Sequence, residues 1–174
     1  MKPIVIAVVG SQNSGKTTTI EVLTRELTKR GYKIATVKHI PEPDFTIDAI
    51  GKDTWRFAQA GAKTIVAVSA NEIATIEKLK TESFSLEMIL QKCEGNDVVF
   101  LEGLRKLISK YEDIHKIVVV KSAEETLEAV KNLGHIVAFT GPYEPKNNEI
   151  PYVDVLKNPE KLADLVEKVI GKRD

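Results

Sequence analysis

Eight residues, from Gly10 to Thr17, form the pattern of a phosphate-binding loop. They read Gly-Ser-Gln-Asn-Ser-Gly-Lys-Thr and match G-x-x-x-x-G-K-[ST]. In such a loop, backbone N–H groups line a concave nest for phosphate, and the positive end of the following helix points into it. We therefore expect Lys16 to reach the β- and γ-phosphates of a nucleotide and the Thr17 hydroxyl to ligate Mg²⁺.

The residues on either side of this loop support the prediction. The apolar run 4–9 is typical of a buried strand, and 18–30 has the pattern of a helix. Gly10 lets the chain turn off the strand, and Gly15 lets the backbone approach a phosphate without a Cβ in the way. An ordinary glycine-rich turn between a strand and a helix is the alternative. The predicted nucleotide-binding residues are Gly10, Ser11, Gln12, Asn13, Ser14, Gly15, Lys16, Thr17 and Thr18.

Glu102 is the second candidate for chemistry, because it directly follows the apolar run 97–101. Ligands of open α/β sheets lie beyond the carboxyl ends of the strands. Nucleotide-hydrolysing enzymes with this loop place an acidic residue there, which touches Mg²⁺ directly or through water. We predict Lys16 and Glu102 as catalytic residues and Thr17 and Glu102 as metal ligands. A solvated carboxylate at a strand end is the alternative.

A second group of polar residues follows the predicted strand 33–38. The segment 39–52 is long and irregular, and such loops in compact domains are usually functional or mobile. His39 has the chemistry of a ligand, a base or a hydrogen-bond donor to phosphate. The basic pair at 105–106 follows Glu102 closely. Solvated side chains without a role are the alternative for each. The predicted second anion site or partner site comprises Lys38, His39, Asp48, Lys52, Asp53 and Arg105.

Composition limits the classes of partner and the compartment. The chain has 174 residues, for which one domain over 1–174 is the expectation, with 25 Lys and Arg against 25 Asp and Glu. This balance argues against a surface for nucleic acid or membrane, so anion binding must be local. Cys93 is the single cysteine, which excludes an intramolecular disulfide. No apolar run reaches about twenty residues, and the first one is too short for a signal peptide, so we expect a cytoplasmic protein.

Strands and helices alternate along the chain, which predicts an α/β fold. We expect a three-layer α/β/α arrangement like that of P-loop NTPases, with a mainly parallel sheet. The runs 64–69 and 73–77 predict an antiparallel hairpin, which we expect to make the sheet mixed. Two helix starts are also predicted from their side chains: Asp53 as an N-cap, and Ser122 with Glu125 as a capping box.

The residues alone do not decide which nucleobase is bound. Guanine-specific GTPases of the Ras type carry Asn-Lys-x-Asp after a strand. Here the corresponding strand ends Val120-Lys121-Ser122, with no Asp two residues after the lysine.

An ordered set of short motifs resembles the MobB family, the molybdopterin-guanine dinucleotide biosynthesis protein B family. The resemblance is close over residues 2–108 and holds only in outline beyond them. Two departures occur: Ile40-Pro41-Glu42-Pro43 stands where family members often have further histidines, and Gly103-Leu104-Arg105 replaces Gly-Phe-Lys. The shared motifs are Gly15-Lys16-Thr17-Thr18, Val37-Lys38-His39, Asp48, Gly51-Lys52-Asp53-Thr54, Arg56, Ala60-Gly61-Ala62 and Phe100-Leu101-Glu102-Gly103.

The resemblance implies a GTP-binding accessory protein of molybdenum cofactor biosynthesis with weak Mg²⁺-dependent GTPase activity. It further implies a homodimer that works with the guanylyltransferase joining GMP to molybdopterin. By position, Lys16 and Thr17 would hold phosphates and Mg²⁺, and Glu102 the metal or its water. A small-molecule kinase with the same loop, and a nucleotide-switched binding module without significant catalysis, are the alternative functions.

Overall fold

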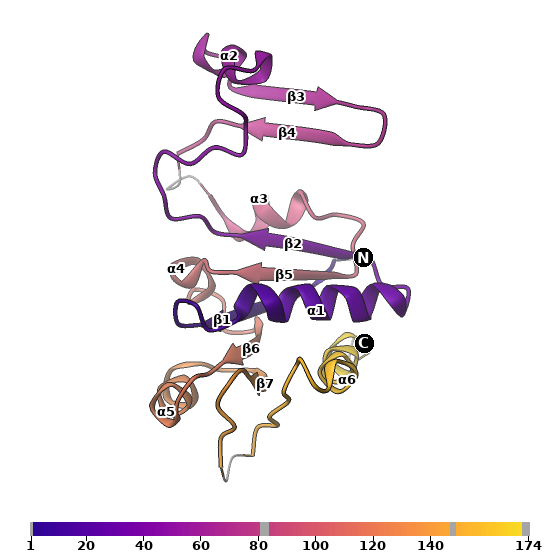
Figure 1. Cartoon of the computed structure of the whole chain (residues 1–174), viewed down its shortest axis with the longest axis vertical. Helices are drawn as coiled ribbons and strands as arrows, with labels where there is room; N and C mark the ends of the chain where they lie inside the picture. The colour runs from indigo at the N-terminus through magenta and orange to yellow at the C-terminus, as the bar shows by residue number, and fades with distance from the viewer. Residues whose placement is uncertain (1, 81–83, 147–148, 172–174) are drawn as a thin grey trace. The chain divides into compact units, whose positions relative to one another are not determined.

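The computed structural model describes residues 2–80, 84–146 and 149–171, which fold into two compact units (Figure 1). One unit, here called the sheet unit, comprises the described residues up to His39 and from Leu86 onward. The other, the hairpin unit, comprises those of Ile40–Ser85. That the whole chain acts as a single nucleotide-binding domain stays a prediction.

The sheet unit contains five parallel strands in the order β2-β5-β1-β6-β7. The strand β1 lies in the centre, and its residues Ile6–Val9 are buried, as expected for a strand covered on both faces. Because all five strands run the same way, their carboxyl ends meet at one edge of the sheet. The strands are β1 (Ile4–Gly10), β2 (Ile34–Lys38), β5 (Val98–Glu102), β6 (His115–Val119) and β7 (Ile136–Thr140).

Helices cover both faces of this sheet, which confirms the predicted three layers. On one face, Leu23 of α1 and Leu162 of α6 pack in the same cluster as Val8. On the other face, Leu101 packs with Leu86 of α3, and with side chains from α4 and α5. The helices are α1 (Lys16–Lys29), α3 (Leu86–Gln91), α4 (Arg105–Ile108), α5 (Ala123–Asn132) and α6 (Pro159–Ile170).

The predicted helix caps are confirmed at one position and corrected at another. At α5 the Ser122 hydroxyl accepts a hydrogen bond from the Glu125 N–H at 3.2 Å. The Glu125 carboxylate accepts from the Lys121 N–H instead of the Ser122 N–H that a full capping box would use. The prediction of Asp53 as an N-cap is wrong, because Lys52 occupies that position and Asp53 is already helical.

The hairpin unit consists of α2 (Asp53–Gln59) and the antiparallel pair β3 (Thr64–Val68) and β4 (Ile73–Glu77). The register runs from Thr64 opposite Glu77 to Val68 opposite Ile73. The predicted hairpin is therefore confirmed, but the expectation of one mixed sheet is wrong, since the hairpin forms a separate two-stranded sheet. Two β-rich runs joined by a short turn pair with each other locally and need no strand of the larger sheet.

Candidate functional site

The loop between β1 and α1 has the backbone geometry of a phosphate nest. Asn13 and Gly15 have positive φ angles of 56° and 104°, and Gly15 is the N-cap of α1. Gly10 is closely packed, because an added Cβ would lie 2.5 Å from the Val119 carbonyl oxygen. The Ser14 hydroxyl is buried without a hydrogen-bond partner in the described part of the chain. These features fit a loop that closes around phosphate oxygens.

Lys16 begins α1 and lies within an excess of positive charge. Its ammonium donates to the Ser11 carbonyl oxygen at 2.5 Å. Burial lowers the pKa of Lys16, the Glu102 carboxylate raises it, and the neighbouring cations Arg105, Lys121 and Lys38 lower it. An anion bound among these side chains would relieve their mutual repulsion, so the charge distribution fits a polyphosphate.

The predicted metal ligands Thr17 and Glu102 are 85 positions apart in the sequence but are in contact in the structure. The Thr17 hydroxyl donates to the two Glu102 carboxylate oxygens at 3.0 and 2.9 Å. The Lys38 ammonium lies 3.5 Å from the same carboxylate, because the register of β2 and β5 places Lys38 beside Glu102. A hydroxyl and a carboxylate are the hard oxygen ligands that Mg²⁺ prefers. These residues therefore fit Mg²⁺.

A site of this kind needs few protein ligands. Within the described residues, no group of three or more His, Cys, Asp or Glu side chains is arranged to hold a metal ion. Magnesium is usually bound by one or two carboxylates, with substrate phosphates and water completing its octahedron. The pair of Thr17 and Glu102 suits that mode and does not suit an all-protein cage.

Two further cations bind the phosphate loop through its carbonyl groups. Arg105 donates to the Gly10 carbonyl oxygen at 2.9 Å, and the Lys121 ammonium donates to that of Gln12 at 3.1 Å. From the sequence, Arg105 was expected in the second anion site, and Lys121 had no predicted role. The signal for Lys121 was its position just beyond β6, after Val120, since β6 pairs with β1 and ends beside the loop.

The remaining predicted site residues divide between the two units. His39 follows β2, its N–H donates to the Glu102 carbonyl oxygen at 2.9 Å, and its side chain is exposed. In the hairpin unit, Asp48 accepts from the Thr54 hydroxyl at 2.8 Å, and Asp53 lies 3.5 Å from Arg56. A joint second site of these residues with Arg105 stays a prediction. The Lys106 side chain lies outside the described residues.

Comparison with known proteins identifies the family. The sequence model described as "Molybdopterin guanine dinucleotide synthesis protein B", MobB, matches residues 5–141. The chain belongs to the MobB family. The expected resemblance is thereby confirmed.

Individual MobB relatives support this assignment. A putative molybdopterin-guanine dinucleotide biosynthesis adapter protein of Methanocaldococcus jannaschii is 37% identical over 69% of this chain. The match covers 48% of that relative, so the chain spans about half of its length. The adapter protein of Haemophilus influenzae is 26% identical over 93% of this chain and 86% of its own. A crystal structure of molybdopterin-guanine biosynthesis protein B (mobB) is 26% identical, covers 97% of this chain and 100% of its own, and superposes with a TM-score of 0.75.

Proposed function

We propose that this chain binds Mg²⁺–GTP at the loop Gly10–Thr17 and hydrolyses it slowly. The observation that carries the proposal is the contact of the Thr17 hydroxyl with the Glu102 carboxylate beside the Lys16 ammonium. Bound Mg²⁺ would neutralise negative charge on the phosphates. The loop N–H groups and Lys16 would hold the phosphates, Thr17 and Glu102 would hold the metal, and Glu102 would also position the reacting water.

The names of relatives support the proposed role in the cell. Relatives are named adapter proteins of molybdopterin-guanine dinucleotide biosynthesis. The chain is an accessory protein of molybdenum cofactor formation in the cytoplasm, and its partners are molybdopterin and the guanylyltransferase that joins GMP to it. No helix of the described residues is long and apolar enough to cross a bilayer.

Calorimetry with Mg²⁺ and either GTP or ATP tests nucleotide binding. Lys16→Ala should lose about 2–4 kcal/mol of GTP binding free energy, because it removes a charge-assisted contact to phosphate. Lys29→Ala is the matched control, since Lys29 lies in the last turn of the same helix and is exposed. Equal GTP affinity of the Lys16→Ala variant and the wild type would show that this loop is not the nucleotide site.

A homodimer forms through the hairpin unit. The side chains of Val68 and Ile73 face each other across β3 and β4, and are 73% and 70% exposed. Exposed apolar patches of this kind mark interaction surfaces. Val68→Lys should convert the dimer to a monomer in sedimentation equilibrium. Leu127→Lys, on the exposed face of α5, should leave the dimer intact, and a wild-type monomer at micromolar concentration would contradict the proposal.

The segment 39–53 responds to nucleotide and contributes to the second anion or partner site. Its length, its two prolines and its origin at the carboxyl end of β2 support this proposal. Hydrogen exchange across 39–53 should slow when Mg²⁺–GTP binds, since ordering of a segment by phosphate is a common switching device. Unchanged exchange, together with normal partner capture by Lys52→Ala and Arg105→Ala, would show that the segment is only a connection.

A further inference from the structure

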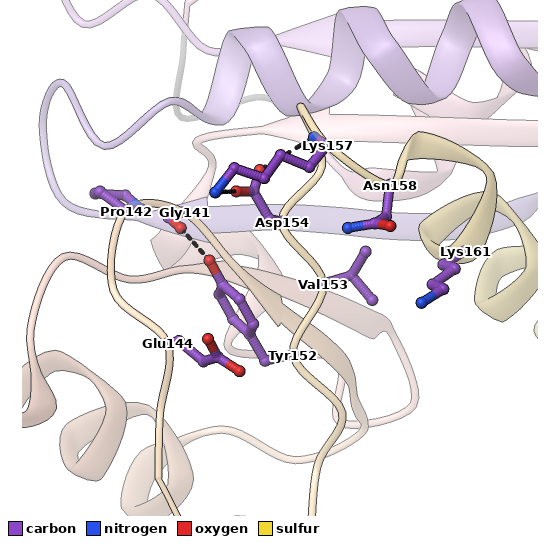
Figure 2. Close-up of a pocket in the computed structure, with 9 residues that line it drawn as sticks. All are labelled: Gly141, Pro142, Glu144, Tyr152, Val153, Asp154, Lys157, Asn158 and Lys161. Carbon is purple, nitrogen blue, oxygen red and sulfur yellow. Dashed lines mark hydrogen bonds and ion pairs between the residues drawn. The ribbon is translucent and has the colours of Figure 1, made fainter.

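A hollow lies in the sheet unit, outside the phosphate loop. It is a cavity of about 410 Å³ between the turn that follows β7 and the start of α6. Figure 2 shows its lining, in which Gly141 and Pro142 come from the turn and Asn158 and Lys161 from the helix start. None of the lining residues belongs to the loop Gly10–Thr17.

The cavity adjoins the phosphate loop at the carboxyl edge of the sheet. Gly10 pairs with Val119, and Val119 pairs with Thr140, which immediately precedes the cavity residue Gly141. Because neighbouring strands lie about 4.8 Å apart, Thr140 is about 10 Å from Gly10. An added Cβ at Gly10 would lie 3.2 Å from the Val119 Cβ, and one at Gly141 would lie 3.0 Å from its Cγ1. The Val119 side chain therefore separates the cavity residue Gly141 from the loop residue Gly10.

The cavity contains a carboxylate that is held in a fixed orientation. Asp154 Oδ1 accepts hydrogen bonds from the backbone N–H groups of Leu156 and Lys157 at 3.1 and 3.3 Å. The other oxygen, Oδ2, lies 3.2 Å from the Lys157 ammonium, whose side chain is 81% exposed. Such an exposed ion pair contributes little, so a ligand can displace it. The Asp154 carboxylate is thus anchored through Oδ1 and presents Oδ2 to the cavity as an acceptor.

The Tyr152 side chain, which also lines the cavity, is held in place as well. The Tyr152 hydroxyl donates to the Gly141 carbonyl oxygen at 2.7 Å, and Tyr152 pairs with Phe139 in a single bridge that extends the sheet beyond β7. The Asn158 side chain makes no capping hydrogen bond to α6, although Asn158 is its N-cap residue. Figure 2 marks no hydrogen bond between its amide and the other lining residues that are drawn.

The geometry points to this cavity as the nucleobase site, with Asp154 Oδ2 as the acceptor that selects guanine. The inference rests on the proposed binding of a nucleotide at the phosphate loop, and it supplies the base recognition that the sequence lacks. Guanine carries two neighbouring N–H donors, N1–H and the 2-amino group, where adenine offers no such pair. An ionised carboxylate only accepts, so it matches guanine at this edge. Glu144 also lines the cavity, but it is exposed, and the described residues show no hydrogen bond or ion pair that holds it.

The substitution Asp154→Asn tests the inference with little disturbance of the fold. Asparagine keeps an oxygen for the N–H groups of Leu156 and Lys157 and replaces Oδ2 by an amide donor. Affinity for Mg²⁺–GTP should fall about 10- to 100-fold, because the asparagine amide donor then faces the N–H donors of guanine. Affinity for Mg²⁺–XTP should rise, since xanthine carries a carbonyl in place of the 2-amino group. Binding of Mg²⁺–tripolyphosphate, which has no base, should stay unchanged.

The comparison variant is Glu144→Gln, which should keep the wild-type order of GTP, XTP and ATP affinities. Two results would overturn the inference and leave the phosphate loop as the nucleotide site. In the first, Asp154→Asn binds tripolyphosphate and keeps the wild-type nucleotide preference. In the second, the nucleotide preference changes in Glu144→Gln instead. If the wild type binds neither tripolyphosphate nor GTP, the proposed function itself fails and the base site falls with it.

Discussion

The substitution Glu102→Gln separates a functional carboxylate from a structural one. In the free protein the Glu102 side chain accepts from the Thr17 hydroxyl and lies 3.5 Å from the Lys38 ammonium. Glutamine retains an acceptor for Thr17 and loses the ion pair. The Glu102 side chain is 13% exposed, but the Lys38 side chain is 56% exposed, so water screens the pair and it contributes about 0–1 kcal/mol. For a protein of this size the free form should change its Tm by no more than about 4 °C.

The nucleotide-bound state should respond far more strongly to Glu102→Gln. Loss of a charged oxygen ligand should reduce the gain in GTP affinity that Mg²⁺ provides by about tenfold or more. Hydrolysis should fall about tenfold or more, the effect of removing a group that positions the reacting water. Calorimetry with GTP in Mg²⁺ and in EDTA measures the first effect, and single-turnover hydrolysis measures the second.

A matched control lies directly before the first residue of β5. Asp97→Asn also converts a carboxylate to an amide, and it keeps an acceptor for the Lys33 N–H, which binds Asp97 at 2.8 Å. It should leave both the Mg²⁺ dependence and the turnover unchanged. A Glu102→Gln variant that loses more than about 3 kcal/mol of unfolding free energy, yet keeps its Mg²⁺ dependence and turnover, would refute the reasoning.

Two further predictions concern single side chains. Thr17→Ala should abolish most of the Mg²⁺ dependence of GTP binding and leave binding in EDTA unchanged. Thr17→Ser, which keeps a hydroxyl, should retain the Mg²⁺ dependence. Equal losses of affinity in Mg²⁺ and in EDTA would show that Thr17 is not a metal ligand. Lys116 is buried, its ammonium donates to the Ile114 carbonyl oxygen at 2.7 Å, and burial lowers its pKa below the ordinary 10.5. Between the pKa of Lys116 in the folded protein and its pKa in the unfolded chain, the unfolded chain binds more protons. The buried ammonium therefore lowers the unfolding free energy at neutral pH, and this loss of stability disappears as the pH rises toward 10.5. In urea unfolding, Lys116→Met should therefore be more stable than the wild type at pH 7, and the difference should shrink by pH 10; a constant difference would contradict this assignment.

Local patterns in the sequence were sufficient for much of the fold and part of the site. The strand before the loop Gly10–Thr17 and the helix after it depend on residues close to each other in sequence, and both are confirmed. The N-cap Ser122 is equally local, since its partner lies three residues away. Glu102 was found at the edge of the sheet because it follows a continuous apolar run, which is typical of a strand buried on both faces.

Strand order and the packing of distant segments decided the remainder. Lys121 and Arg105 reach the phosphate loop because β6 and β5 flank β1, and no local pattern encodes which strands become neighbours. The hairpin forms its own sheet, although its residues would equally suit an edge strand of the larger one. The cavity at Asp154 exists because the chain returns beside β7 after the turn at Gly141, through a single bridge. Hydrogen bonds between neighbours in sequence can be recognised from residue types alone, whereas contacts between distant segments depend on how the whole core packs.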